Sequence, residues 1–344
     1  MLSGAKPMKN SKRLSTKSKT PLLIIGAAVF VIVAAVMNIC LGASGMSLAK
    51  LWSALMAGPG NSANQRILWY VRFPRTLACL LAGAGLAVSG AIIQKVLAND
   101  LASPGIIGVN AGAGLAVTIC CAFGVFSAWA VAGSSFAGAM IATALVVAAG
   151  RKSKASKTTV VLGGVAVTAC LNALTETVLT IVPDAALSSR DFRIGGFSSV
   201  NRDRLIPAAI LIILGIIFVC TLSNELDVLS LGDDTAHSLG LNVSLVRNGL
   251  LALAALLAGA SVSFAGVLGF VGLIVPHMAR RIAGTESGTL LPFCALSGAG
   301  FVAVCDLIAR MIFAPYELPT GIILSILGGP FFIWLLHKRK GKKS

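Results

Sequence analysis

Residues 76–97 read TLACLLAGAGLAVSGAIIQKVL, and Lys95 is the one charged side chain in this run. A helix that spans a membrane needs about 20 mostly apolar residues, because the hydrocarbon core is about 30 Å thick and each residue rises about 1.5 Å. This run has that length, and similar runs recur along almost the whole chain. The sequence therefore predicts an all-α integral membrane protein.

The composition of the whole chain points the same way. Of its 344 residues, 56% are hydrophobic and only 12% are charged, and the mean hydropathy is +0.91. A soluble domain carries roughly 25% charged residues, so this chain has too few polar side chains to cover a water-facing surface. The composition therefore excludes a soluble fold.

The apolar runs predict about ten transmembrane helices. They cover residues 21–42, 76–97, 107–124, 127–149, 158–182, 205–222, 248–264, 266–283, 288–313 and 318–337. Because residues 248–283 are almost continuously apolar, one long kinked span is an alternative there. That alternative gives nine spans and places the two termini on opposite sides of the membrane.

The basic residues favour ten spans. The net charge is +16, and Lys and Arg cluster in residues 1–20, 150–157 and 338–344. Basic loops stay on the cytoplasmic side, so both termini are expected there. The predicted organisation is a basic cytoplasmic tail (1–20), a ten-helix membrane domain (21–337) and a second basic cytoplasmic tail (338–344). Nucleic-acid binding is the weaker interpretation of the charge, because no folded basic face is available.

Two stretches oppose this topology. Residues 66–75 and 190–204 fall on the external side, although each is rich in arginine. The arginines are Arg66, Arg72, Arg75, Arg190, Arg193, Arg202 and Arg204. Since exported basic residues are disfavoured, either the topology is wrong or these side chains have an external role.

A short internal repeat is also present. The pattern L-A-G-A-x5-G occurs at residues 81–90 and again at 257–266, about half the chain later. The predicted topology runs the two copies in opposite directions, as in the inverted repeats of many transporters. The alternative is a chance match in sequence rich in Gly and Ala.

Motifs for chemistry are absent from the sequence. It contains no G-x-x-x-x-G-K-[ST], no G-x-G-x-x-G after a strand and no H-E-x-x-H. The eight cysteines lie in apolar runs without a C-x-x-C pair, as expected of small buried hydrophobic residues. The sequence thus predicts no catalytic residue, no metal site and no cofactor bound by this chain. Energy for transport would come from ions or from a partner.

Two acids lie well inside predicted spans. Asp306 has Arg310 four residues later, one helical turn away, where the two could pair. Glu176 and Asn172 form a polar stripe on the fifth span, which either lines a pathway or makes hydrogen bonds between helices. If ions drive transport, Glu176 is the candidate site, and the protein is an ion-coupled secondary transporter.

The loop 223–247 is acidic although the topology places it in the cytoplasm. Gly232 and Gly240 would separate two short helices, and Asp233 and Asp234 suit the N-terminus of the second. Two amphipathic helices on this face suggest a docking surface for another protein. An ordinary structured loop is the alternative.

Several ordered motifs resemble one family over about residues 20–337. They lie at residues 72–77 (RFPRTL), 90–94 (GAIIQ), 99–108 (NDLASPGIIG), 231–232 (LG), 239–241 (LGL), 269–277 (GFVGLIVPH) and 317–321 (ELPTG). The chain resembles the FecCD-type permeases of ATP-binding-cassette importers for iron-siderophores, haem and cobalamin.

This resemblance implies a cobalamin-importer-like (type II) permease fold with about ten transmembrane helices per protomer. It also implies a homodimer, or a pair with a close paralogue, with the pathway between the copies. The implied partners are two cytoplasmic ATPase subunits that bind ATP and Mg, an extracytoplasmic substrate-binding protein and membrane lipid, with no nucleic acid. A ferric siderophore is the expected substrate, and cobalamin and haem remain open.

The resemblance also assigns roles to residues. Docking of the binding protein falls to Arg72, Arg75 and Arg310. Coupling to the ATPase falls to the helices at about 230–243, with Leu231, Gly232, Asp233, Asp234, Ala236, Leu239, Gly240 and Leu241. A cytoplasmic gate is expected at Thr158 and Thr159, before the stripe of Asn172 and Glu176. It assigns no role to Arg190, Arg193, Arg202 and Arg204.

Overall fold

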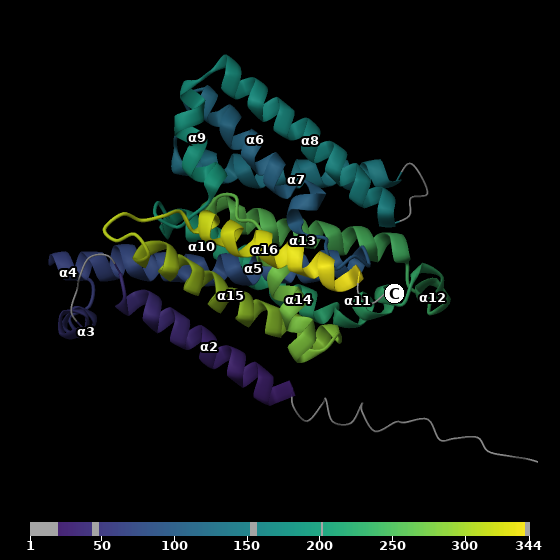
Figure 1. The fold of residues 1–344 in the computed structure, drawn as a ribbon, viewed down its shortest axis with the longest axis horizontal. Coiled ribbons are helices and arrows are strands. Elements are labelled where there is room, and N and C mark those ends of the chain that lie inside the picture. The colour runs from purple at the N-terminus through teal and green to yellow at the C-terminus, as the bar shows by residue number, and fades with distance from the viewer. Residues whose placement is uncertain (1–19, 43–47, 152–156, 201, 341–344) are drawn as a thin grey trace, which may run out of the picture.

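A computed structural model describes residues 20–42, 48–151, 157–200 and 202–340. Within these ranges the chain forms helices and short connections and no strand (Figure 1). Ten helices coincide with the predicted apolar runs. They are α2 (Thr20–Cys40), α5 (Phe73–Val96), α6 (Val109–Ala122), α7 (Ala128–Arg151), α8 (Lys157–Ile181), α10 (Arg202–Thr221), α13 (Val243–Ala265), α14 (Val271–Ala283), α15 (Ser287–Met311) and α16 (Thr320–Lys340).

Length and hydropathy alone identify fewer spans than ten. Six helices in the described part of the chain are long and apolar enough to cross a membrane by themselves. A seventh is formed if α10 and the short α11 (Ser223–Ser230), which meet at a bend of 60°, count as one span. Helix α6 and the part Thr320–Leu335 of α16 are apolar but shorter. Helix α14 has only 13 residues. These three complete the ten, and each packs against a longer neighbour.

The chain breaks within residues 248–283, as ten spans require. Helix α13 ends at Gly266, which has φ of 70°, and α14 begins after Phe270, which has φ of 65°. Positive φ is unusual for a residue with a Cβ, so Phe270 marks a sharp change of direction. The single kinked span is therefore wrong.

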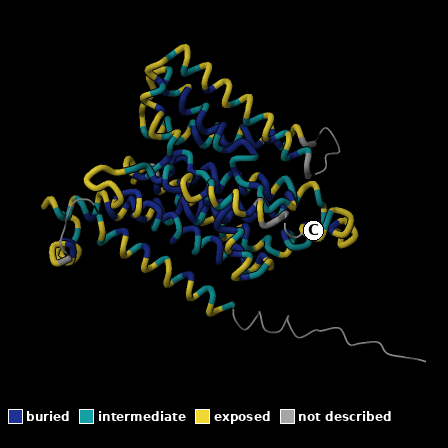
Figure 2. The backbone as a smooth tube through the Cα atoms, viewed as in Figure 1, coloured by how far each residue is buried: buried dark blue, intermediate teal, exposed yellow. Residues whose placement is uncertain are grey.

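Helix α5 is the centre of the bundle, and Figure 2 shows the buried part of the chain around it. It packs against α13, α14 and α15. Glycines make these contacts close: a methyl group added at Gly83 or at Gly90 would lie under 3.0 Å from a carbonyl oxygen of α15 or α14. Such small residues let helix backbones approach each other in a membrane.

The two copies of the L-A-G-A pattern lie on α5 and α13, which run in opposite directions. The Ser89 hydroxyl donates to the Ala254 carbonyl at 2.6 Å. Earlier on α5, Gly85 faces Leu257 and Ser261, later on α13. The predicted antiparallel relation of the two copies is therefore present in the fold.

Short helices gather at the two ends of the bundle (Figure 1). At one end lie α3 (Leu48–Met56), α4 (Ala63–Arg66), the π-helix η1 (Ile67–Arg72) and α9 (Asp184–Ile194). At the other end lie α11 and α12 (Asp233–Ser238), together with the start of α2 and the end of α16. The first and last described residues are thus at the same end, as an even number of spans requires. A short 3-10 helix, η2 (Pro104–Ile107), links α5 to α6.

Candidate functional site

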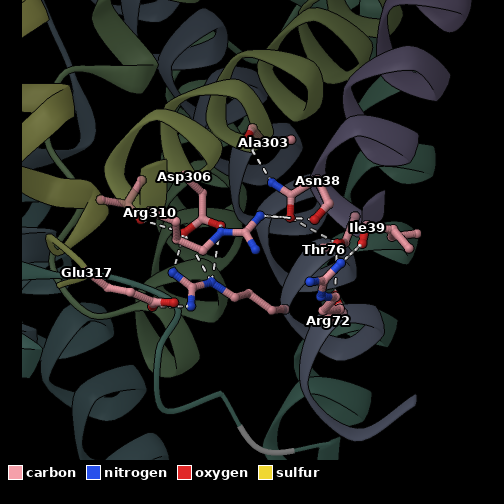
Figure 3. A network of polar contacts seen from close by, with 10 residues as sticks. Asn38, Ile39, Arg72, Thr76, Ala303, Asp306, Arg310 and Glu317 are labelled. Carbon is pink, nitrogen blue, oxygen red and sulfur yellow. Dashed lines mark hydrogen bonds and ion pairs between the residues drawn. The ribbon is translucent and has the colours of Figure 1, made fainter. Parts of the chain in front are cut away.

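Asp306 is the centre of a buried charge network at the end of the bundle that contains α3 and α9. Arg75 donates to it from Nε, at 3.1 Å to Oδ2, and from Nη2, at 3.0 Å to Oδ1 (Figure 3). Thr320 donates its hydroxyl to the same Oδ1 at 2.9 Å. Arg75 also reaches the Glu317 carboxylate, with Nη1 at 2.6 Å from Oε2. Arg75 on α5 thus joins α15 to the segment that precedes α16.

Arg310 is the second guanidinium on Asp306. Its Nε lies 3.2 Å from Asp306 Oδ2, so the predicted pair one turn apart is confirmed. Its Nη2 donates to Asn38 on α2, at 2.7 Å to the side-chain oxygen and 3.0 Å to the backbone carbonyl. Asn38 in turn donates to the Ala303 carbonyl at 2.8 Å. Arg310 and Asn38 therefore fasten the end of α2 to α15.

Arg72 binds backbone carbonyls. Its Nη1 donates to the carbonyls of Ile39, at 2.6 Å, and Cys40, at 3.0 Å (Figure 3). The last carbonyls of a helix have no partner within the helix, and a cation is stabilised next to them. Arg72 therefore closes the C-terminal end of α2.

The network lies inside the protein. Asp306 has no exposed surface, and Arg72, Arg75 and Arg310 are all less than a tenth exposed. Buried charges of this kind need partners, because their removal from water is costly. The three arginines therefore have a role within the chain, and their predicted docking of a binding protein stays a prediction.

Four other arginines at this end of the bundle are exposed. They are Arg66, Arg190, Arg193 and Arg202. The side chain of Arg204 lies outside the described residues.

Sequence analysis assigned no role to Asn38, Thr320 and Glu317 of the buried network. Thr320 and Glu317 do lie in the ELPTG motif at residues 317–321, one of the motifs shared with the family.

At the opposite end, α11 and α12 form the two short helices predicted for the acidic loop. Gly232 and Gly240 separate them from their neighbours with φ of 110° and 83°, and Asp233 and Asp234 occupy the first turn of α12. Leu231 and Leu239 are 64% and 63% exposed, whereas Ala236 is buried. Apolar and acidic side chains are thus presented together on a protruding surface.

A hollow of about 560 Å³ lies beside these helices. Asp233, Asp234 and His237 line it from α12. Leu241 lines it from the connection that follows, and Val243 from the first residue of α13. The surface therefore combines a hollow with acidic side chains, as expected where another protein docks.

Asp227 links α11 to the core of the bundle. Lys95, near the end of α5, pairs with its carboxylate. Ser287, the first residue of α15, donates to that carboxylate from its backbone N at 3.0 Å and its hydroxyl at 2.8 Å. Lys95 also donates to the Ser287 hydroxyl at 2.6 Å. A carboxylate at a helix N-terminus satisfies free N–H groups and the helix dipole, so α11 is fastened to α5 and α15 together.

The predicted pathway residues lie on the outermost helix, α8. Asn172 and Glu176 are both exposed, and Glu176 Oε1 lies 2.9 Å from Arg193 Nη2. Thr159 is half-buried in the first turn of α8, and the side chain of Thr158 lies outside the described residues. Glu176 lies within the candidate span Thr159–Ile181, in the last two turns of α8, and its partner is on α9. That it lines a pathway stays a prediction.

No metal site is formed by the residues that the structure describes. None of their His, Cys, Asp and Glu side chains gather in a group of three or more that could hold an ion. The cysteines are free thiols within helices.

The chain is similar to two import permeases over nearly its full length. The vitamin B12 import system permease protein BtuC of Shigella boydii is 34% identical over 317 residues, which cover 91% of this chain and 94% of that protein. The Fe(3+)-citrate import system permease protein YfmD of Bacillus subtilis is 35% identical over 336 residues, which cover 98% of this chain and 100% of that protein.

A solved structure has the same architecture. It is an inward-facing conformation of a metal-chelate type ABC transporter, with a TM-score of 0.82 and 29% identity over 92% of this chain and 99% of that one. The sequence profile of the FecCD transport family matches residues 29–338. The chain therefore belongs to the FecCD transport family.

Proposed function

We propose that this chain is the permease subunit of an ATP-binding-cassette importer that moves a metal chelate into the cell. The observation that carries the proposal is the exposed pair α11 and α12, which is joined through Asp227 to the two central helices α5 and α15. A permease without a nucleotide motif needs such a surface to receive work from a separate ATPase. In this proposal ATP and Mg are bound by that partner, and α11, α12 and both termini face the cytoplasm.

The polar face of α8 supports a second copy as partner. Asn172, Glu176 and Thr177 are exposed on a helix that is long and apolar enough to cross a membrane. Polar groups at membrane depth are stable where they face a water-filled path or another protein. A homodimer, or a pair with a close paralogue, would place this face on a pathway between the copies, with the gate at Thr158 and Thr159.

The external binding protein would dock on the end that carries α4 and α9. The exposed Arg66, Arg190 and Arg202 lie at this end and suit an acidic partner surface, since charge complementarity increases the rate of association. The buried network beneath them, including Arg72, Arg75 and Arg310, would hold the outer ends of α2, α5 and α15 in place as the partner binds.

The substrate is proposed to be a ferric chelate, with a siderophore as the first choice. The two relatives described above are named for vitamin B12 and for Fe(3+)-citrate. Both compounds are therefore alternative substrates that a test must include. Haem remains a further candidate.

Uptake in proteoliposomes tests the proposal. The chain is reconstituted with its ATPase and binding protein, and labelled ferric siderophore, ferric citrate, haem and cobalamin are compared with and without ATP. We expect one ferric chelate to be taken up only with ATP. Charge reversal of both Arg190 and Arg202 to Glu should raise the half-saturating concentration of binding protein about fivefold or more, since each exposed pair is worth up to about 1 kcal/mol.

Glu176→Gln is the control that distinguishes the ATP-driven importer from an ion-coupled secondary transporter. Because Glu176 is exposed and paired with Arg193, this change should leave ATP-dependent uptake within about twofold of the unchanged protein. Uptake that follows a proton gradient without ATP, and that Glu176→Gln abolishes, would instead establish an ion-coupled secondary transporter.

Asp227→Asn tests the link between α11 and the core. The change keeps the shape of the side chain but removes the charge that holds Lys95 and the first turn of α15. We expect ATP hydrolysis to continue while uptake falls about tenfold or more, because a hydrogen bond to a charged group is worth about 1.5–3 kcal/mol. Rates of hydrolysis and uptake are measured on the same vesicles.

Asp234→Asn is the matched control, because Asp234 is also acidic and close by but, in the part of the chain that the structure describes, pairs with no residue of α5 or α15. It should weaken binding of the ATPase without changing the ratio of uptake to hydrolysis. Equal losses of both activities in Asp227→Asn would contradict the proposed link.

A further inference from the structure

Helix α2 leaves an open groove along the side of the bundle. It packs chiefly on α15 and lies apart from the remaining helices at the edge of the molecule (Figure 1). Between α2 and the helices α14, α15 and α16 lies a groove of about 890 Å³. Its walls are apolar and include Leu22, Phe30, Ile282, Phe293 and Phe331.

The mouth of this groove carries a cation, Arg281. Arg281, in the last turn of α14, is exposed, and its guanidinium carbon lies 5.0 Å from the centre of the Trp334 ring. Among the described residues no acid pairs with it. Its neighbour Arg280 points inward instead, with its Nη2 at 3.4 Å from Asp100 and a hydrogen bond to Gln94. Arg281 is therefore available to a ligand outside the helix bundle.

The position of these groups matches the boundary of a membrane. Trp and Arg are common where the hydrocarbon core meets the head groups, because each has an apolar body and a polar end. The end of α14 and the later part of α16 lie at the same end of the bundle as the first described residue, Thr20. Basic pockets between transmembrane helices on the cytoplasmic side bind anionic lipid head groups.

We propose that this groove binds an anionic phospholipid, with its acyl chains along α2 and its phosphate on Arg281. The apolar walls suit the chains, and the positive guanidinium of Arg281 selects the charge of the head group. The N-terminal tail is a poorer occupant, since residues 1–20 contain no acid and several Lys and Arg, which Arg281 would repel. The proposal does not depend on the transported substrate.

Fluorescence of Trp334 reports occupancy directly. Trp52, Trp69 and Trp129 are replaced by Phe, and the protein is placed in bilayers that contain brominated phosphatidylglycerol or brominated phosphatidylcholine, which quench a nearby indole. We expect half-maximal quenching at about a fivefold lower fraction of phosphatidylglycerol, since one basic residue at the membrane surface contributes about that factor. Arg281→Gln should reduce this preference to about one and high salt should weaken it.

A steric variant tests the groove separately from the charge. A Cβ added at Gly26, which lines the groove, would meet no atom within 4 Å, so Gly26→Phe starts a side chain in open space at the groove. It should reduce quenching by both lipids. Gly133 on α7 is equally open, and Gly133→Phe should leave quenching unchanged.

Native mass spectrometry of the protein with all four tryptophans is the second measurement, in case the single-tryptophan variant does not fold. Phosphatidylglycerol should remain bound to the unchanged protein more often than phosphatidylcholine, and Arg281→Gln should remove the difference. Equal binding of the two lipids would mean annular lipid only and would overturn the proposal. Absence of quenching by either lipid would mean that a second copy or the tail fills the groove, and it would also overturn the proposal.

Discussion

Asp306→Asn should destabilise the protein more than any other single loss of charge. Among the described residues, Arg75 would keep only the partly exposed Glu317, and Arg310 would keep only the neutral Asn38. Removal of one partner from a buried ion pair costs roughly 3–5 kcal/mol, because the other charge stays buried and uncompensated. The expected result is a lower midpoint of thermal unfolding in detergent, together with loss of uptake.

A second variant distinguishes charge balance from shape. Asp306→Asn combined with Arg310→Met removes one negative and one positive charge together, and it should recover part of the lost stability. Asp184→Asn is the control, since Asp184 is an exposed acid in the first turn of α9 and its loss should change the midpoint little. If Asp306→Asn has the same midpoint of thermal unfolding as the unchanged protein, the network does not hold these helices together.

Gly90→Leu should prevent normal packing of the central helices. Even the first added carbon would lie under 3.0 Å from the Gly272 carbonyl, which is backbone of α14 and cannot turn away. Overpacking of a close contact costs about 1–3 kcal/mol or more, and here the two helices must separate along their length. We expect little folded protein by size-exclusion chromatography, and Gly90→Ala should fold with a lower thermal midpoint.

Gly114→Ala on α6 is the matched control for Gly90→Ala. Gly114 is also a buried helical glycine, but an added methyl group there meets no atom within 4 Å. Its replacement should be neutral or slightly stabilising, because Ala has the higher helix propensity. If both Ala variants melt alike, the effect at Gly90 is one of propensity and the close contact with α14 is unimportant.

The fold was predictable to the extent that it depends on local pattern. Ten apolar runs predicted ten helices, since length and hydropathy act within each segment. The break between α13 and α14 was harder, because the apolar run continues across it. It depends on the backbone of Gly266 and Phe270, and only the glycine is a residue type that sequence analysis associates with positive φ.

The charged sites were only partly predictable, because their partners are far apart along the chain. The Asp306–Arg310 pair spans one helical turn and was predicted correctly. Arg75 meets Asp306 across 231 positions, and Lys95 meets Asp227 across 132, so nothing local indicated either pair. For the same reason an arginine predicted at the external end could not be classified as buried or exposed from sequence alone.

The long separation of Arg75 and Asp306 also constrains the order in which this protein is made. Arg75 is synthesised 231 residues before its partner, an interval of about 10–50 s at the usual rates of translation. During this time α5 has no acid from α15 to offset a charge that is costly in lipid. It follows that the start of α5 must stay near the head groups, where a long side chain reaches water, until α15 has been inserted.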